Sequence, residues 1–181
     1  MLFGKKIFLR YLEPPDADVL HQWENDKSHW NVTGTQKPFT KKEIKSFISN
    51  QKDIYLDKQL GWMICTPPIS PLSPGRGIGG EVGCIDLFEF NKTNLTAGIG
   101  ILVDKNHRRN GYGSEALSLL VTYSFEILNL KQLYCNISAD NTASMNLFQK
   151  HKFKTVEKKK EAHLLVIARN RVTKQSPRKK E

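Results

Sequence analysis

The segment TAGIGILVDKNHRRNGYGSEALSLLVTYSFEI, residues 96–127, joins an apolar run to an amphipathic one through a loop rich in Gly and Arg. Residues 96–104 predict a strand. From residue 114 to residue 130, apolar side chains recur at the three- and four-residue spacing of a helix. A second strand, KQLYCNISA, follows at residues 131–139. We expect this unit to be a right-handed parallel crossover that organises the sheet.

The connecting loop HRRNGYGSEA, residues 107–116, has the composition of an anion site. The amide N–H groups of a first helical turn lack partners within the helix, and the helix dipole adds partial positive charge there. Gly111 and Gly113 permit close approach of the backbone, and Arg108 and Arg109 add charge-assisted contacts. Neither the Walker pattern nor the dinucleotide pattern G-x-G-x-x-G is present. The alternative is a Gly-rich turn with exposed arginines.

The composition predicts one soluble globular domain. The chain has 181 residues, of which 39% are hydrophobic and 25% charged. No apolar run is long enough to span a bilayer, and the first residues lack a signal-peptide pattern, so we expect a cytoplasmic protein without a membrane. Cys65, Cys84 and Cys135 are odd in number and far apart, which predicts neither a disulfide framework nor a metal site.

The net charge of +10 is concentrated at the C-terminal end. Residues 150–181 carry 12 Lys/Arg and 3 Asp/Glu, whereas residues 1–149 carry 16 and 15. We therefore expect a single domain over residues 1–170, followed by a basic, disordered tail at residues 171–181. Nucleic-acid binding through these basic residues is a minority alternative, because no recognised nucleic-acid-binding motif accompanies them.

Further elements are predicted on both sides of the central unit. Pro14 and Pro15 end a first strand, and Asp16 is a candidate helix cap. Thr40, with Glu43 three residues on, predicts a capping box. Helices are expected near residues 16–26, 40–51 and 142–151, strands near 6–12, 59–66, 81–90, 153–156 and 163–168, and a Pro- and Gly-rich loop at 67–80.

Arg108-x-x-Gly111-x-Gly113 matches the Q/R-x-x-G-x-G/A pyrophosphate loop of the GNAT N-acetyltransferase superfamily. Over about residues 6–160 the chain resembles the branch that contains ribosomal-protein and spermidine N-acetyltransferases. The loop alone is a weak signal; with its strand, its helix and the downstream segment LYCNISADNTASMNLFQKHKF it is a specific one. The resemblance implies an α/β fold of the α+β type: a mixed, mostly antiparallel sheet, a central parallel strand–helix–strand unit that binds acetyl-CoA, and helices on both faces.

The resemblance also implies how acetyl-CoA is held. Its pyrophosphate would lie on the amides of residues 109–114, and its pantetheine arm would bond to the strand backbone at Ile101 and Val103. Asn141 matches an asparagine that contacts pantetheine in the family, and it is equally a helix cap. No metal is expected. The implied co-substrate residues are Ile101, Val103, Arg108, Arg109, Asn110, Gly111, Tyr112, Gly113, Ser114, Asn141, Ser144 and Phe148.

Two positions depart from the usual catalytic residues of the family. Phe148 stands where many relatives have a tyrosine that protonates the departing thiolate, and it has no hydroxyl. Gly98 stands where a glutamate is often offered as the base. The acid is therefore open: Tyr134, Ser144 and Tyr112 are candidates, and solvent is the alternative.

Two acidic residues are candidates for the missing base. In residues 81–90, strand alternation places Asp86 on one face with Cys84, Phe88 and Phe90, an apolar environment that raises a carboxyl pKa on burial. Asp86 is therefore the first choice, and Glu24 in the N-terminal helix is the second. A structural or solvated Asp86 is the alternative.

The last part of the family pattern is also altered. Lys152 stands where relatives usually carry a glycine before the phenylalanine. The family's final long strand is hard to find, because a basic sequence follows residues 163–168. We expect this strand to be short, displaced or supplied otherwise.

Together these residues predict an acetyl-CoA-dependent N-acetyltransferase that acts by direct attack of a primary amine on the thioester. The acceptor is expected to be a small-molecule amine or a protein N-terminus, bordered by residues 23–30 and 67–80. The sequence shows no dense acidic cluster, which disfavours polyamines. A non-catalytic CoA-binding module, suggested by Gly98 and Phe148, is the alternative, and the resemblance allows a homodimer.

Overall fold

The computed structural model describes residues 1–26, 37–51, 53–67 and 80–169. Eight strands are found within these residues: β1 (Leu2–Phe3), β2 (Phe8–Tyr11), β3 (Leu60–Cys65), β4 (Glu81–Asn91), β5 (Thr96–Val103), β6 (Gln132–Ser138), β7 (Lys154–Lys158) and β8 (Ala162–Ala168). They form one sheet in the order β1-β2-β3-β4-β5-β6-β8-β7. Every neighbouring pair is antiparallel except β5 and β6, which are parallel.

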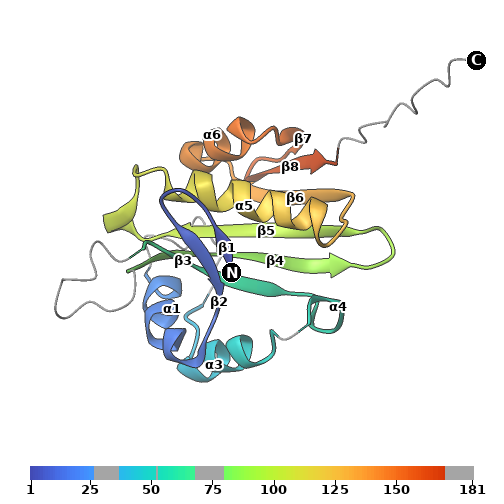
Figure 1. Cartoon of the computed structure of the whole chain (residues 1–181). Coiled ribbons are helices and arrows are strands. Elements are labelled where there is room, and N and C mark those ends of the chain that lie inside the picture. Colours follow the sequence, from blue (N-terminus) through green and yellow to red (C-terminus); the bar gives the residue numbers. More distant parts are fainter. Residues whose placement is uncertain (27–36, 52, 68–79, 170–181) are drawn as a thin grey trace, which may run out of the picture.

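Helices cover both faces of this sheet (Figure 1). The helices α5 and α6 lie on one face, and α1 and α3 lie on the other. The expected mixed, mostly antiparallel sheet with helices on both faces is therefore confirmed. No helix among the described residues is both long and apolar enough to cross a membrane. The bounds are α1 (Ala17–Glu24), α3 (Lys41–Ser49), α4 (Ile54–Asp57), α5 (Tyr112–Glu126) and α6 (Thr142–Lys150), with short 3-10 turns at Pro14–Asp16 and Lys105–His107.

Each face of the sheet carries its own hydrophobic core, because successive strand side chains point to opposite faces. On the α5 side, Leu117 and Leu120 are fully buried in one cluster with Ile85 and Leu87 of β4. On the α1 side, a smaller cluster joins residues from α1 and α3 to the sheet. Its buried members are Ala17, Leu20, Trp23, Ile44, Ile48, Met63, Cys65 and Leu102.

The predicted elements are found with small shifts at their ends. α5 begins at Tyr112, two residues before the periodic pattern, because Gly111 is its N-cap with a φ of 83°. Two short elements, β1 and α4, have too few residues to show a period and were not predicted. The last strand is neither short nor displaced: β8 pairs with all of β6, from Gln132 opposite Ala168 to Ser138 opposite Ala162.

One sequence prediction about β4 is wrong. Phe90 was expected to share the face of Asp86, but it lies in the opposite core with Leu87. The register between β4 and β5 shifts between Phe88 and Asn91, and Glu89 has a positive φ of 49°. A bulge at this point adds one residue to the strand, so Phe90 turns to the other face.

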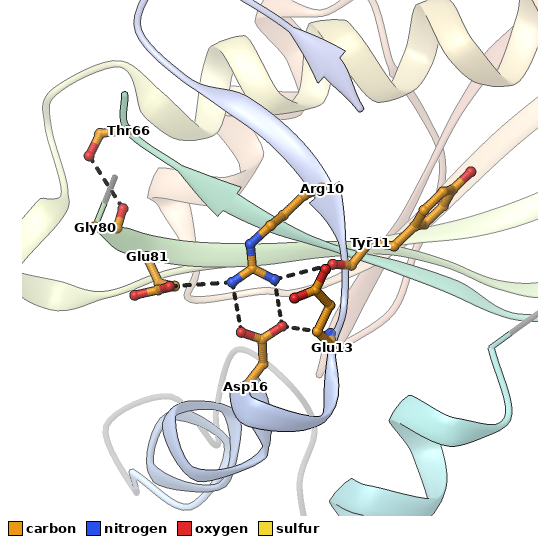
Figure 2. Close-up of polar contacts among 7 residues, drawn as sticks. All are labelled: Arg10, Tyr11, Glu13, Asp16, Thr66, Gly80 and Glu81. Carbon is orange, nitrogen blue, oxygen red and sulfur yellow. Dashed lines mark hydrogen bonds and ion pairs between the residues drawn. The ribbon is translucent and has the colours of Figure 1, made fainter. Parts of the chain in front are cut away.

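An ion-pair network fixes the start of α1 to the sheet (Figure 2). Arg10 of β2 donates to both carboxylate oxygens of Asp16, each at 2.7 Å, and to Oε1 of Glu81 at 3.3 Å. The backbone N–H of Glu13 donates to Asp16 at 2.7 Å. Asp16 directly precedes α1 as expected, but its side chain makes no capping bond to the helix. Its carboxylate instead joins helix and strand.

We predict that Arg10→Met destabilises the protein by about 3 kcal/mol, because it leaves the buried Asp16 carboxylate without its guanidinium. The measurement is urea unfolding at neutral pH. The double substitution Arg10→Met/Asp16→Leu should recover part of this loss, since it removes both charges. Equal stability of Arg10→Met and the parent would contradict this account of the network.

Candidate active site

The parallel pair β5 and β6 separates after three residues. Thr96, Ala97 and Gly98 of β5 lie opposite β6, whereas Ile99–Val103 have no strand partner on that side among the described residues. β6 continues instead along β8. The far half of β5 thus presents peptide groups at an open edge, on which an extended ligand can add hydrogen bonds as another strand would.

A loop at the end of this open edge leads into α5. The first bond within the helix runs from the N–H of Glu115 to the C=O of Gly111, at 3.1 Å. The N–H groups of Tyr112, Gly113 and Ser114 precede that bond, so the helix itself offers them no acceptor. Arg109 also takes a positive φ of 64°. These features make the start of α5 suitable for an anion.

The side chains of the loop hold it against the strand. Arg108 Nε donates to the C=O of Val103 at 3.1 Å, and Asn110 Nδ2 donates to the C=O of His107 at 3.1 Å. Ser114 Oγ lies 2.8 Å from His151 Nε2. Burial lowers the pKa of His151, which favours a neutral ring that accepts the Ser114 hydroxyl proton. The loop is therefore a constrained structure and not only an exposed turn.

The turn between β1 and β2 reaches the same loop, which the sequence did not indicate. Lys6 Nζ donates to the C=O of Asn110 at 3.2 Å. The carboxylate of Glu115, in the first turn of α5, accepts from the backbone N–H groups of Lys5 and Lys6. This contact depends on two segments 109 residues apart. No local pattern predicts it.

α6 lies beside this region and begins at Asn141. Asn141 Oδ1 accepts from the N–H of Ser144 at 3.0 Å, which is a capping bond. Its Nδ2 has no partner among the described residues. Phe148 is 3% exposed and packs edge-on against Phe153, with ring centroids 5.0 Å apart. The structure thus places Asn141 half-buried before the start of α6 and Phe148 in the core.

A pocket of about 360 Å³ lies between α1, α3 and the central strands. Three carboxyl groups, from α1, α3 and β4, meet at its wall. The sequence showed no acidic cluster because these residues are far apart along the chain. Residues 27–30 and 68–79, expected to border the acceptor, lie outside the described residues. The lining residues are Leu12, Leu20, Glu24, Phe39, Glu43, Ile44, Phe47, Gln59, Gly61, Cys84, Ile85 and Asp86.

Two of these carboxyl groups, Glu24 and Asp86, influence each other. Burial raises the pKa of Glu24 to about 7, and the charge of Asp86 adds to this rise. Burial also raises the pKa of Asp86 to about 6. A hydrogen bond from the Gln59 side chain acts in the opposite direction and lowers it. The fold thus brings together the two acids that were chosen from the sequence as candidate bases, both with a pKa near neutrality.

The carboxylate of Asp86 leans over β5. A Cβ at Gly100, opposite Asp86 in the register, would lie only 2.5 Å from Asp86 Oδ1. At Gly98 the space for a side chain is filled by the ring of Phe88. The absence of side chains at these two glycines therefore lets Asp86 and Phe88 reach across β5 toward the place where β6 separates.

Tyr134 of β6 lies opposite Gly98, at the last paired position before β5 and β6 separate. Its ring packs edge-on against Phe88, with centroids 5.9 Å apart, and its hydroxyl donates to the Glu89 carboxylate. Burial raises the pKa of Tyr134, and the hydrogen bond to Glu89 adds to this. The phenol is therefore protonated at neutral pH. Within the described residues no group of three or more His, Cys, Asp or Glu side chains is placed to hold a metal ion.

Comparison with protein families matches residues 6–154 to the acetyltransferase (GNAT) domain. Among individual proteins, the chain is 27% identical over 157 residues to an uncharacterized N-acetyltransferase, p20, of Bacillus licheniformis. This match covers 84% of the chain and 81% of the relative. The homologous region thus includes the open strand edge, the Gly-Arg loop and Asp86.

Solved structures show the same fold. The spermidine N-acetyltransferase of Vibrio cholerae, in complex with CoA and spermine, superposes with a TM-score of 0.77 at 17% identity, over 91% of this chain and 96% of that one. A putative ribosomal-protein-serine acetyltransferase of Vibrio cholerae gives a TM-score of 0.69 at 20% identity, over 93% and 97%.

We predict that Glu24→Gln stabilises the protein at pH 8 and changes it little at pH 5. A carboxyl whose pKa is raised in the folded state stabilises it below the unfolded pKa, and that contribution is lost as pH rises through about 7. The gain at pH 8 is on the order of 2 kcal/mol. Urea unfolding at both pH values measures it. The exposed Glu161→Gln serves as control, and an equal pH effect in both variants would contradict the prediction.

Proposed function

The chain belongs to the GNAT acetyltransferase family, and from that premise we propose an acetyl-CoA-dependent N-acetyltransferase in which Asp86 accepts the proton of a primary amine. The observation that carries the proposal is the meeting of two sites at one place in the sheet. The open edge belongs to β5, the carboxyl-lined pocket is lined by the neighbouring strand β4, and the Asp86 carboxylate of that pocket lies against Gly100 of β5.

The residues around the open edge fit acetyl-CoA. Peptide groups of Ile101 and Val103 lie on the part of β5 without a strand partner, where a pantetheine arm can bond. The N–H groups at the start of α5, with Arg108 and Arg109, fit the pyrophosphate. The Nδ2 group of Asn141 is a further donor. Lys6 is a further candidate for binding the pyrophosphate, because its ammonium contacts the same loop.

The chemistry needs a base for the amine and an acid for the departing sulfur. Acetyl-CoA, when bound, supplies an acetyl thioester. Asp86, in its ionised form, takes a proton from the amine as the C–N bond forms and the C–S bond breaks. Desolvation by the apolar walls disfavours the ammonium form and eases this transfer, whereas the neighbouring carboxylates favour the ammonium and help to bind it. The Glu24 carboxylate provides a second negative charge near the amine.

Tyr134 is the proposed acid. Its phenol is protonated at neutral pH, and it lies on the strand β6 where β5 and β6 separate. Phe148 supplies no hydroxyl and is part of the core. Of the other two candidates, Tyr112 is the first residue of α5 and Ser144 lies in the first turn of α6, where its backbone N–H donates to Asn141. The Tyr134 hydroxyl is the proposed donor for the sulfur, and its proton, which is held by the Glu89 carboxylate, must turn to the sulfur for this step.

Several expectations remain proposals. The acceptor is a small-molecule amine or a protein N-terminus, the protein is cytoplasmic, and it forms a homodimer. The domain boundary near residue 170 and the basic tail at 171–181 lie outside the described residues. Light scattering on the purified full chain measures the assembly.

We predict that Asp86→Asn lowers kcat/KM for amines at least tenfold and abolishes the rise of kcat/KM with pH near 6. The parent should gain activity as pH increases through the Asp86 pKa of about 6, because only the ionised carboxylate accepts a proton. Release of free thiol from acetyl-CoA measures this between pH 5 and 9.

Glu24→Gln is the matched test of the second candidate base. It should retain the pH-dependent rise and kcat, since Asp86 remains, whereas KM for the amine should rise because one carboxylate near the ammonium is lost. A tenfold loss in Glu24→Gln with an unchanged Asp86→Asn would reverse the two roles. Acetyl-CoA binding without acetylation of any amine by the parent would support the non-catalytic alternative.

We predict that Lys6→Ala raises KM for acetyl-CoA about threefold to tenfold and leaves kcat unchanged, because it removes one cation from the phosphate loop. The increase should shrink at high salt. Lys5→Ala is the control, since only the backbone of Lys5 contacts α5. An identical KM in the two variants would exclude Lys6 from the site.

A further inference from the structure

The walls of the acceptor pocket are mainly apolar. Its apolar wall is formed by Leu12, which directly follows β2, and by Leu20 of α1 with Ile44 and Phe47 of α3. Apolar walls favour an apolar body on the ligand, because contact with them removes apolar surface from water. A sugar ring or a chain of hydroxyl groups would lose hydrogen bonds to water there without finding new partners.

The charged groups of the pocket are all acidic. The lining includes Glu24, Glu43 and Asp86, and no Lys, Arg or His among the described residues. A ligand that carries a carboxylate or phosphate would meet like charges in a place with little water. The lining therefore fits a cation and disfavours an anionic acceptor.

Glu43 is committed to its own helix. Its Oε2 accepts from the N–H of Thr40 at 2.7 Å and from Thr40 Oγ1 at 2.8 Å, while Thr40 Oγ1 accepts from the N–H of Glu43 at 3.2 Å. This capping box fixes the start of α3. In the adjoining depression, Asp57 accepts from the N–H of Asp53 at 3.0 Å. These outer carboxylates serve helix ends.

The inner pair Glu24 and Asp86 is thus the place for one ammonium, and the other carboxylate of the described lining, Glu43, is held at the start of α3 by its capping box. We propose that the acceptor is a primary amine on a compact, uncharged apolar body, such as an alkylamine or arylalkylamine. This inference rests on the proposed function, because it assumes that the pocket beside Asp86 receives the acceptor.

The test compares two ligands of equal length. Hexylamine and 1,5-diaminopentane differ only in a terminal methyl or ammonium group. With acetyl-CoA and free-thiol detection, we expect kcat/KM for hexylamine to exceed that for the diamine at least tenfold. Phenethylamine should behave like hexylamine, whereas 6-aminohexanoate, glucosamine and spermidine should be poorer acceptors than either.

A variant of the pocket wall reverses the preference. Phe47 is half-buried on α3, so Phe47→Asp adds a carboxylate to the apolar wall without emptying the core. It should bring the ratio of the two kcat/KM values to three or less. Ser49→Asp, on the exposed side of the same helix, adds the same charge outside the pocket and should leave the ratio unchanged. Thermal melting confirms that both variants are folded.

The outcomes separate this inference from the function on which it rests. If the parent acetylates the diamine, spermidine or glucosamine as well as hexylamine or better, the apolar-amine inference is wrong and acetyl transfer stands. If the parent binds acetyl-CoA in calorimetry but acetylates no amine in the panel, the proposed function itself fails. An unchanged preference in folded Phe47→Asp would show that the acceptor binds elsewhere.

Discussion

The short pairing between β5 and β6 is the constraint on which the site depends. Three paired residues join the two halves of the sheet, and beyond Gly98 β5 continues without a partner on that side. α5 connects the same two strands, and its Leu117 and Leu120 are buried in the core that it shares with them. Its N-terminus is therefore held where the open edge ends. An unpaired strand edge and a helix start suited to an anion thus follow from a single crossover.

The position of the Glu24–Asp86 pair depends on how α1 is fixed to the sheet. The Arg10–Asp16 pair ties the start of α1 to β2, and α1 then places Glu24 beside Asp86 of β4. Across β5, glycine at position 100 leaves room for the Asp86 carboxylate. The carboxyl pair is thus positioned by contacts on three strands and one helix. Loss of any one contact moves a charge relative to the open edge.

Periodicity and cap residues in the sequence were sufficient for most helices and strands, because these signals are local. The loop at residues 107–116 was also recognisable, because its Gly and Arg content is itself a local signal for the start of a helix. The face of Phe90 was misplaced, since a bulge at Glu89 depends on pairing with β5. Lys6 and the meeting of Glu24 with Asp86 could not be predicted, because each joins segments far apart in the chain. Such contacts are decided by tertiary packing alone.

Two positions that depart from the family pattern, Gly98 and Phe148, are consistent with other residues taking over the functions of the usual acid and base. Phe148 needs no polar partner in the core, where a phenol would need one. The only strand-borne phenol beside the separation of β5 and β6 among the described residues is Tyr134. Burial raises the pKa of both Glu24 and Asp86 toward neutrality, so both carboxyl groups exchange protons near neutral pH. A cation placed beside them would favour the ionised form of both carboxyl groups.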